Sequence, residues 1–354
     1  MTVVSTRVAI GAVGVLLGGV VCFESLFTKA GSQPHKSATE IQPEVEDAWL
    51  DALAERLSTR RIEPSSELVD RLHVLLAQSG HSEHGKRRVA TELRSLERIA
   101  LKGAAEGSPG RRFLARELDG CWHICQIGTR LADSGQAHLG QVAWYLAQLP
   151  GTDDFSFEIA PDARLPMRDL VIADLSAVAG PERLEWLVPA LLHWRSDDGW
   201  SDRFQRIHRL DDLAASLLAQ SEGEAPCFGG HWWDAVAVIA QSDDSRISSR
   251  VHSQARAMVV DHCSAVLDHS IEIVAELRDA EGRPRENARA FARLAHTCLW
   301  LARSKRIAGD RNAEAYHVLF RTLKEQLELG IADYRLPDLA HGLQAIRLDA
   351  QSSH

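Results

Sequence analysis

The chain has 354 residues, of which 45% are hydrophobic and 25% are charged, a composition typical of folded globular proteins rather than disordered ones. Its formal net charge is -9, and its longest basic run is Lys86-Arg87-Arg88. Because nucleic-acid-binding domains carry an extended basic patch, we expect no nucleic-acid partner.

The first feature in chain order is an uncharged apolar run at residues 8–23, which follows Arg7 and precedes Glu24. A helix of this length spans about 24 Å, which is short for a bilayer crossing and suits a signal sequence. The small-residue cleavage signal Thr28-Lys29-Ala30 is weak, which favours an uncleaved anchor. We therefore expect residues 1–27 to be an N-terminal membrane anchor, or alternatively a signal peptide.

The charge at Arg7 predicts the orientation of this anchor. Positive residues stay on the cytoplasmic side, so the rest of the chain is expected outside the cytoplasm. The predicted location is the bacterial inner membrane, crossed once, with secretion after cleavage as the alternative. The membrane is the one partner that the sequence predicts.

A polar stretch at residues 28–42, which contains Pro34, is typical of a linker. Beyond it the 3.6-residue period of apolar side chains predicts an N-terminal helical segment at 43–118 and a helical domain at 119–350. Alternating residues predict a single strand at 155–159. The expected helices are 44–57, 66–79, 90–102, 112–118, 122–132, 136–149, 167–178, 181–194, 204–219, 232–242, 249–281 with one break, 286–303, 313–329 and 337–348.

The connections between these helices are short, which favours antiparallel helical hairpins. Hairpins of similar length over about 300 residues must close or stack to bury every apolar face. We therefore predict an all-α fold that closes into an α/α toroid, with an open α-solenoid as the alternative. No strict repeat is visible, so a regular tetratricopeptide array is not expected.

Cysteine usage is the next feature, because five of the six cysteines lie beyond the apolar run. An odd number leaves at least one thiol unpaired in an oxidising compartment. Cys263 and Cys298 lie among apolar helical residues, so we expect buried free thiols there.

Several segments together resemble a known superfamily. They are HLGQVAWYLAQL (138–149), LEWLVPALLHW (184–194), CFGGHWWDAVAVI (227–239) and RLAHTCLWLA (293–302). In order and spacing they resemble uncharacterised exported bacterial proteins similar to the α/α-toroid superfamily, which includes terpenoid cyclases and protein prenyltransferase β subunits. The resemblance covers roughly residues 115–350 and implies a toroid. The Asp-x-Asp-Asp motif and the glutamine–tryptophan repeat are missing, which counts against cyclisation of a triterpene.

The helix at 136–149 carries the first candidate site. His138, Gln141 and Tyr145 recur at helical spacing and share one face, and His341 and Gln344 repeat the three-residue spacing. Inner helices of a toroid turn one face to the axis, so these residues are candidates to line a cavity. The alternative is a polar face in solvent, or buried side chains bonded to the backbone.

A second set of candidates surrounds the Gly229-Gly230 pair, which permits a backbone conformation that a Cβ would forbid. His231 and Trp232 would follow in the first helical turn, with a packed tight loop as the alternative. The remaining cavity candidates are the half-buried acid Glu185 with its neighbour Trp186, and His296 with Trp300 one turn later. Tryptophans 144, 186, 232 and 300 are the expected walls.

Metal-ligand patterns are weak in this sequence. The resemblance to prenyltransferases suggests Asp261-x-Cys263 with a later ligand at His317 or His341, and Cys121 and Cys125 would share a helical face. Such short patterns arise easily by chance, so we expect no metal ion and no cofactor.

These observations leave the function open among three classes. We expect a membrane-tethered extracytoplasmic binding or scaffold module whose ligand or protein partner is unknown. One alternative is an enzyme of lyase, transferase or hydrolase type acting on an extended apolar or saccharide substrate in the toroid cavity. The other is a structural envelope protein. The sequence assigns no catalytic residue.

Overall fold

The computed structural model describes residues 43–60, 67–79, 83–97, 115–118, 121–124, 140–160, 163–169, 171, 184–194, 199–201, 205–220, 229–280, 283–309, 312–330 and 334–352. All of them belong to one compact unit, Pro43–His354. The expected anchor and linker at 1–42 lie outside the described residues. Among the helices that are described, none is both long and apolar enough to cross a membrane.

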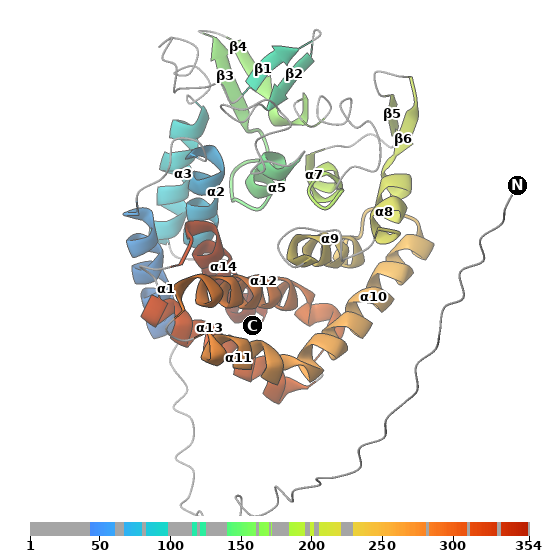
Figure 1. Cartoon of the computed structure of the whole chain (residues 1–354). Coiled ribbons are helices and arrows are strands. Elements are labelled where there is room, and N and C mark those ends of the chain that lie inside the picture. The colour runs from blue at the N-terminus through green and yellow to red at the C-terminus, as the bar shows by residue number, and fades with distance from the viewer. Residues whose placement is uncertain are drawn as a thin grey trace, which may run out of the picture. The chain divides into compact units, whose positions relative to one another are not determined.

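The described part of the chain is mostly helical, which confirms the all-α prediction at that level (Figure 1). Its helices are α1 (Pro43–Ser58), α2 (Glu67–Gln78), α3 (Glu83–Glu97), α5 (Gln141–Ala147), α7 (Leu187–Trp194), α8 (Leu210–Leu218), α9 (Gly230–Gln241), α10 (Ser249–Asp268), α11 (Ser270–Asp279), α12 (Pro284–Ala308), α13 (Ala313–Gly330) and α14 (Leu336–Ser352). The break expected within 249–281 falls at His269, between α10 and α11.

Three short antiparallel hairpins interrupt the helices. They pair β1 (Ala115–Leu118) with β2 (Cys121–Ile124), β3 (Ser156–Ala160) with β4 (Ala163–Pro166), and β5 (Gly199–Ser201) with β6 (Ile207–Arg209). The strand expected at 155–159 is confirmed as β3.

Two of these hairpins correct the sequence prediction. The helix expected at 112–118 was wrong at 115–118, and the helix expected at 122–132 was wrong at 122–124, because the chain there forms β1 and β2, with Leu118 paired to Cys121. The helix expected to begin at 204 begins only at Leu210, because β6 precedes it.

Helices α5, α9 and α14 are buried on nearly all sides. In α9 the side chains from His231 to Ala237 are all buried, and in α14 the same holds from Asp338 to Arg347. A helix that is buried all round lies inside a protein rather than on its surface. Helix α10 has the opposite pattern, because its buried residues recur every fourth position, at Val251, Ala255, Val259, Cys263 and Leu267. Helix α10 therefore covers the interior with one face.

Six helices, which we call the inner helices, contact one another in a fixed order (Figure 1). Helix α2 packs against α5, α5 against α7, α7 against α9, α9 against α12, α12 against α14, and α14 against α2. The other helices pack onto these six: α1 onto α2 and α14, α3 onto α2, α8 onto α7, α10 onto α9, and α11 and α13 onto α12.

Glycines set the close approach of two helix starts. Gly140 and Gly229 cap α5 and α9 in the left-handed conformation, with φ of 76° and 73°. A Cβ on Gly140 would lie 2.8 Å from the Leu187 backbone, and one on Gly230 would lie 2.8 Å from the His296 Cβ. Real Cβ atoms do not approach that closely, so glycine permits α5 to meet α7 and α9 to meet α12 at these points.

Candidate functional site: a buried histidine cluster

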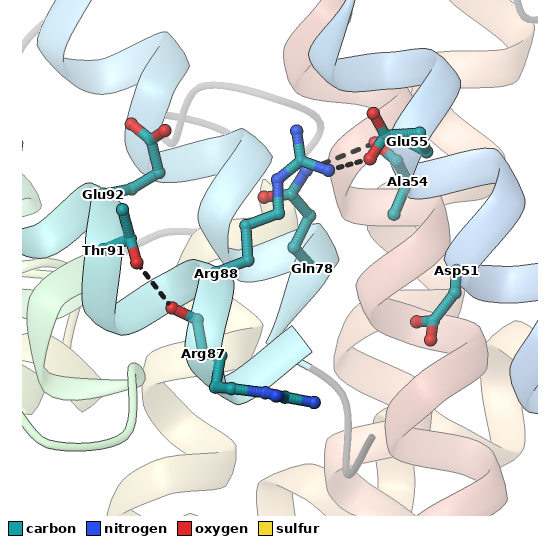
Figure 2. A pocket seen from close by; sticks show the side chains of 8 residues that line it. All are labelled: Asp51, Ala54, Glu55, Gln78, Arg87, Arg88, Thr91 and Glu92. Atoms are coloured by element: carbon teal, nitrogen blue, oxygen red, sulfur yellow. Dashed lines mark hydrogen bonds and ion pairs between the residues drawn. The ribbon is translucent and has the colours of Figure 1, made fainter. Parts of the chain in front are cut away.

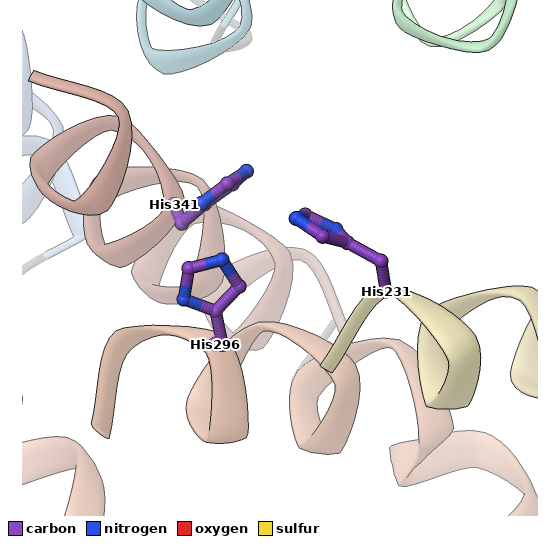
Figure 3. Close-up of side chains that lie close together, drawn as sticks. All are labelled: His231, His296 and His341. Atoms are coloured by element: carbon purple, nitrogen blue, oxygen red, sulfur yellow. The ribbon is translucent and has the colours of Figure 1, made fainter. Parts of the chain in front are cut away.

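Three histidines from different helices converge in the interior. His231 lies in the first turn of α9, His296 in the middle of α12 and His341 near the start of α14, and all three are buried. One ring nitrogen of each lies within 4.8 Å of the others. Figure 3 shows the three rings pointing toward one another from their separate helices.

Hydrogen bonding leaves ring nitrogens of this cluster unused. His296 Nδ1 bonds the Ala292 carbonyl oxygen, one turn back on α12, at 2.7 Å. A carbonyl can only accept, so Nδ1 carries the proton and Nε2 presents its lone pair. Among the described residues, His296 Nε2 and both nitrogens of His341 are buried without a hydrogen-bond partner.

Burial also fixes the charge state of these rings. It lowers the pKa of His296, and it lowers the pKa of His341 well below its usual value, with the neighbouring histidines acting in the same direction on His341. Both imidazoles are therefore neutral at pH 7. Neutral imidazole is the form that binds a metal ion.

The spacing of the nitrogens is close to that of a metal site. A tetrahedral zinc ion with Zn–N bonds of about 2.0–2.1 Å holds its nitrogen ligands about 3.4 Å apart. The three nitrogens lie within 4.8 Å of one another, which is wider than this ligand spacing, so binding an ion requires the rings to move closer together.

Aromatic and polar groups of three more helices surround the cluster. The His73 ring of α2 lies 4.9 Å from that of His341, and the Trp186 ring, directly before α7, lies 4.2 Å from that of His231. Tyr145 of α5 lies between them, because its ring is 4.7 Å from His73 and 5.4 Å from Trp186. Five of the six inner helices therefore contribute one ring each, and the sixth ring, that of Trp186, comes from the residue just before α7.

His73 and Tyr145 form a hydrogen-bonded pair. His73 Nδ1 bonds the Val69 carbonyl oxygen at 2.8 Å, which places the proton on Nδ1. His73 Nε2 therefore accepts from the Tyr145 hydroxyl, at 2.9 Å. Gln141 Nε2 in turn donates to the Tyr145 oxygen at 3.3 Å. Burial lowers the pKa of His73 to about 3.

A second polar layer lies one or two turns further along four of these helices. Arg303 of α12 forms an ion pair with Asp234 of α9 and donates through Nη2 to Gln148 Oε1 at 2.8 Å. Gln344 of α14 donates to the same Gln148 oxygen at 2.9 Å. The guanidinium also lies over the Trp144 ring, 5.5 Å from its centroid. This layer ties α9, α12 and α14 to the C-terminal end of α5.

The structure brings together part of the predicted site. His231, His296 and His341 form the cluster, and Tyr145 and Trp186 contact its edge. Gln141 reaches it through Tyr145. His138 lies outside the described residues, and Glu185 is buried beside Trp186 in the sequence.

Other predicted residues lie elsewhere. Gln344 belongs to the second polar layer, as does Trp144 through its contact with Arg303. Trp232 donates from Nε1 to the Leu217 carbonyl oxygen at 3.0 Å. Trp300 lies 5.8 Å from Trp233, whose ring stacks on His262 of α10 at 3.7 Å.

The metal-ligand patterns considered in the sequence do not form sites. Asp261 is exposed on α10 whereas Cys263 is buried, so the two side chains do not converge. His317 is exposed on α13. Cys121 lies on strand β2, so the helical spacing assumed for Cys121 and Cys125 was wrong at Cys121, and Cys125 lies outside the described residues. Cys263 and Cys298 are buried cysteines, as expected.

His73 was not among the site residues predicted from the sequence. Its neighbours Leu72, Val74, Leu75 and Leu76 make α2 read as an ordinary apolar face. The available signal was a histidine at a position where the 3.6-residue period calls for a buried side chain.

A surface groove between α1, α2 and α3 is the other candidate site, with a volume of about 830 Å³ (Figure 2). Charged residues of the groove form ion pairs with one another or with residues of neighbouring helices. Arg88 forms an ion pair with Glu55, Arg71 lies 3.8 Å from Glu92, and Arg347 donates to Asp51 at 2.8 Å. Most of these ion pairs are partly exposed, and such pairs are common without a ligand, so the histidine cluster is the stronger candidate.

Comparison with protein-family models, with curated proteins and with solved structures gives no match to this chain.

Proposed function

We propose that the chain is an α/α toroid whose axis holds one transition-metal ion, with His231, His296 and His341 as ligands. The observation that carries this proposal is the convergence of three buried rings in which His296 Nε2 and both nitrogens of His341 have no hydrogen-bond partner among the described residues. Leaving a buried polar atom without a partner costs about 1–3 kcal/mol. A bound cation would supply the missing interaction.

Zinc is the first candidate ion. Three neutral imidazoles suit zinc, copper, iron and nickel, whereas calcium and magnesium prefer oxygen ligands. The Nδ1 bond of His296 to a backbone carbonyl is the arrangement that orients metal-binding histidines in many proteins.

Two features support a toroid over an open solenoid. The six inner helices contact one another in cyclic order, including α14 with α2. On four of these helices the residue of the cluster comes before the residue of the second polar layer in the sequence. The pairs are Tyr145 and Gln148, His231 and Asp234, His296 and Arg303, and His341 and Gln344. These four helices therefore run in the same direction from one layer to the other.

Ring closure is testable at the ion pair that joins α1 to α14. A variant with Asp51→Cys and Arg347→Cys should take a bifunctional thiol cross-linker about as long as an arginine side chain, because Arg347 donates to Asp51 at 2.8 Å. An open solenoid separates its first and last helices, so failure to cross-link in the folded protein would contradict closure.

Metal content tests the proposed centre. The full chain, purified without added chelator and analysed by elemental mass spectrometry, should hold about one zinc per chain. Replacing both His296 and His341 by Leu should abolish binding, whereas His262→Phe should not, because His262 stacks on Trp233 outside the cluster. Equal zinc content in all three proteins would refute the proposal.

In the cell we propose a metal-binding module tethered outside the cytoplasm by residues 1–27, and a metal-dependent enzyme is the alternative. A reporter that is active only outside the cytoplasm, fused after Gln42, tests the location. An inactive reporter in a soluble fusion protein would rule out export.

A further inference from the structure

We infer that the three-histidine centre keeps one coordination position open, and that this position takes water, hydroxide or a small anion. The inference rests on the proposed metal centre and concerns what the ion binds beyond the protein. Structural zinc sites have four protein ligands, whereas zinc sites with three protein ligands carry an exchangeable fourth ligand.

The nearest additional histidine is already engaged. His73 lies against His341, with ring centroids 4.9 Å apart, but its Nδ1 bonds the Val69 carbonyl and its Nε2 accepts the Tyr145 hydroxyl proton. Coordination by His73 would break one of these two bonds and turn the ring. His73 therefore belongs to the wall of the site rather than to the ligand set.

The buried carboxylates on the ligand helices are also engaged. Asp234, three residues after His231, pairs with Arg303, and Asp338, three residues before His341, pairs with Arg335 at 3.0 Å. Each carboxylate thus has a cationic partner that coordination would displace.

Cys298 lies two residues after His296 and is buried, but it is not among the side chains whose ligand atoms gather at the cluster. Among the described residues, the only group of three or more metal-binding side chains within reach of one another is His231, His296 and His341.

The charge of such a centre selects the class of the fourth ligand. Three neutral imidazoles leave the double positive charge of the ion uncompensated, and a low-dielectric interior strengthens its attraction for an anion. Zinc bound in this way lowers the pKa of a coordinated water toward about 7. Water, hydroxide and small anions such as azide or thiocyanate are therefore the expected ligands.

The aromatic residues beside the site are expected to select the fourth ligand by its size and polarity. The Trp186 ring lies 4.2 Å from the His231 ring, and Tyr145 lies beyond it, so aromatic rings bound the site on this side. Small ligands are expected to enter this buried site more readily than extended ones.

Cobalt substitution tests the inference. The full chain, freed of zinc and loaded with one equivalent of Co²⁺, should show visible ligand-field bands that shift saturably with azide or thiocyanate and also shift with pH. Bands that respond to neither anion nor pH would mean that the chain supplies a fourth ligand, and would overturn the open position while leaving the metal centre intact. Absence of cobalt binding would instead overturn the metal centre itself.

The variant His73→Phe tests whether His73 is a neighbour of the metal site or one of its ligands. His73→Phe, which cannot coordinate, should keep one bound cobalt and its response to azide. Loss of band intensity or a change to a new coordination geometry in His73→Phe would identify His73 as a ligand and refute the open position. His296→Leu serves as the matched variant that should lose the bands.

Discussion

Acid should destabilise the metal-free protein through its buried histidines, and His73 permits the size of the effect to be estimated. Its pKa is about 3 in the folded protein and 6.5 as a free side chain, because burial disfavours the charged ring. Below pH 6.5 the unfolded chain binds a proton at this position and the folded chain does not. The stability that His73 contributes is therefore complete above pH 6.5 and is lost as the pH falls from 6.5 toward 3.

At pH 5 the loss from this group is about 2 kcal/mol, since each pH unit below the unfolded pKa is worth about 1.4 kcal/mol. His296 and His341 act in the same direction, because burial lowers the pKa of both. The whole protein should thus lose more than His73 alone accounts for. Urea unfolding followed by tryptophan fluorescence, with a chelator present, measures the fall between pH 6.5 and 5.

The variant His73→Gln isolates the contribution of one ring. The glutamine amide accepts the hydrogen bond from the Tyr145 hydroxyl but does not titrate. The fall in the free energy of unfolding between pH 6.5 and 5 should therefore shrink by about 2 kcal/mol. His317→Gln is the control, because the His317 ring is exposed on α13 and should leave the fall unchanged. If His73→Gln loses as much stability as the unaltered protein, the buried neutral state of His73 is refuted.

Two further substitutions and one labelling experiment test the packing around the cluster. Gly230→Ala should destabilise the protein by about 1–3 kcal/mol in thermal unfolding and weaken zinc binding, because the new Cβ would lie 2.8 Å from the His296 Cβ. Arg303→Lys should cost about 1.5–3 kcal/mol in urea unfolding, because an ammonium group cannot reproduce the guanidinium's simultaneous bonds in the second polar layer. Iodoacetamide should label Cys298 only after unfolding, because the thiol is buried and its pKa is raised.

Each of these changes has a matched control or a contradicting result. Gly342→Ala meets only the ends of two leucine side chains, which can move aside, so it should cost less than Gly230→Ala. Arg293→Lys on the same helix alters an ion pair with Glu276 that is more than one-third exposed, and should be nearly neutral. Equal costs within either pair, or rapid labelling of Cys298 in the folded protein, would contradict the described packing.

Helices α10, α11 and α13, which cover the interior, could be predicted from the sequence because each buries one face and exposes the other. The 3.6-residue period gave α10 and α11 together with the break between them, and it placed α13 within one residue at each end. Amphipathic helices carry their tertiary environment in their own residue pattern.

The β1–β2 hairpin shows where the period failed. Its strands have four residues each, too few for a two-residue and a 3.6-residue period to be told apart. The informative signal was Asp119-Gly120 between the paired residues Leu118 and Cys121, because Asp-Gly is a favoured two-residue hairpin turn.

The sequence predicted that several of these residues line one cavity, but it did not predict which of them contact one another. His231 after two glycines and His341 with Gln344 stood out locally, but their distances depend on how α9, α12 and α14 pack. His296 was paired with Trp300 on its own helix, whereas in the structure its ring lies 4.4 Å from His341 and Trp300 turns to Trp233. Sequence spacing predicts neighbours within a helix and does not predict neighbours between helices.

The cluster also has a thermodynamic property that distinguishes it from an ordinary core. A leucine at position 341 would bury without penalty, whereas the histidine buries two ring nitrogens that no described residue satisfies, at a cost of about 1–3 kcal/mol each. Core positions free of other demands favour apolar residues. Several imidazoles converging at one point, next to a fully hydrogen-bonded His73–Tyr145 pair, therefore indicate an added interaction at that point. The proposed metal ion would supply that interaction, and the proposal predicts that zinc binding stabilises the fold by an amount that His296→Leu removes.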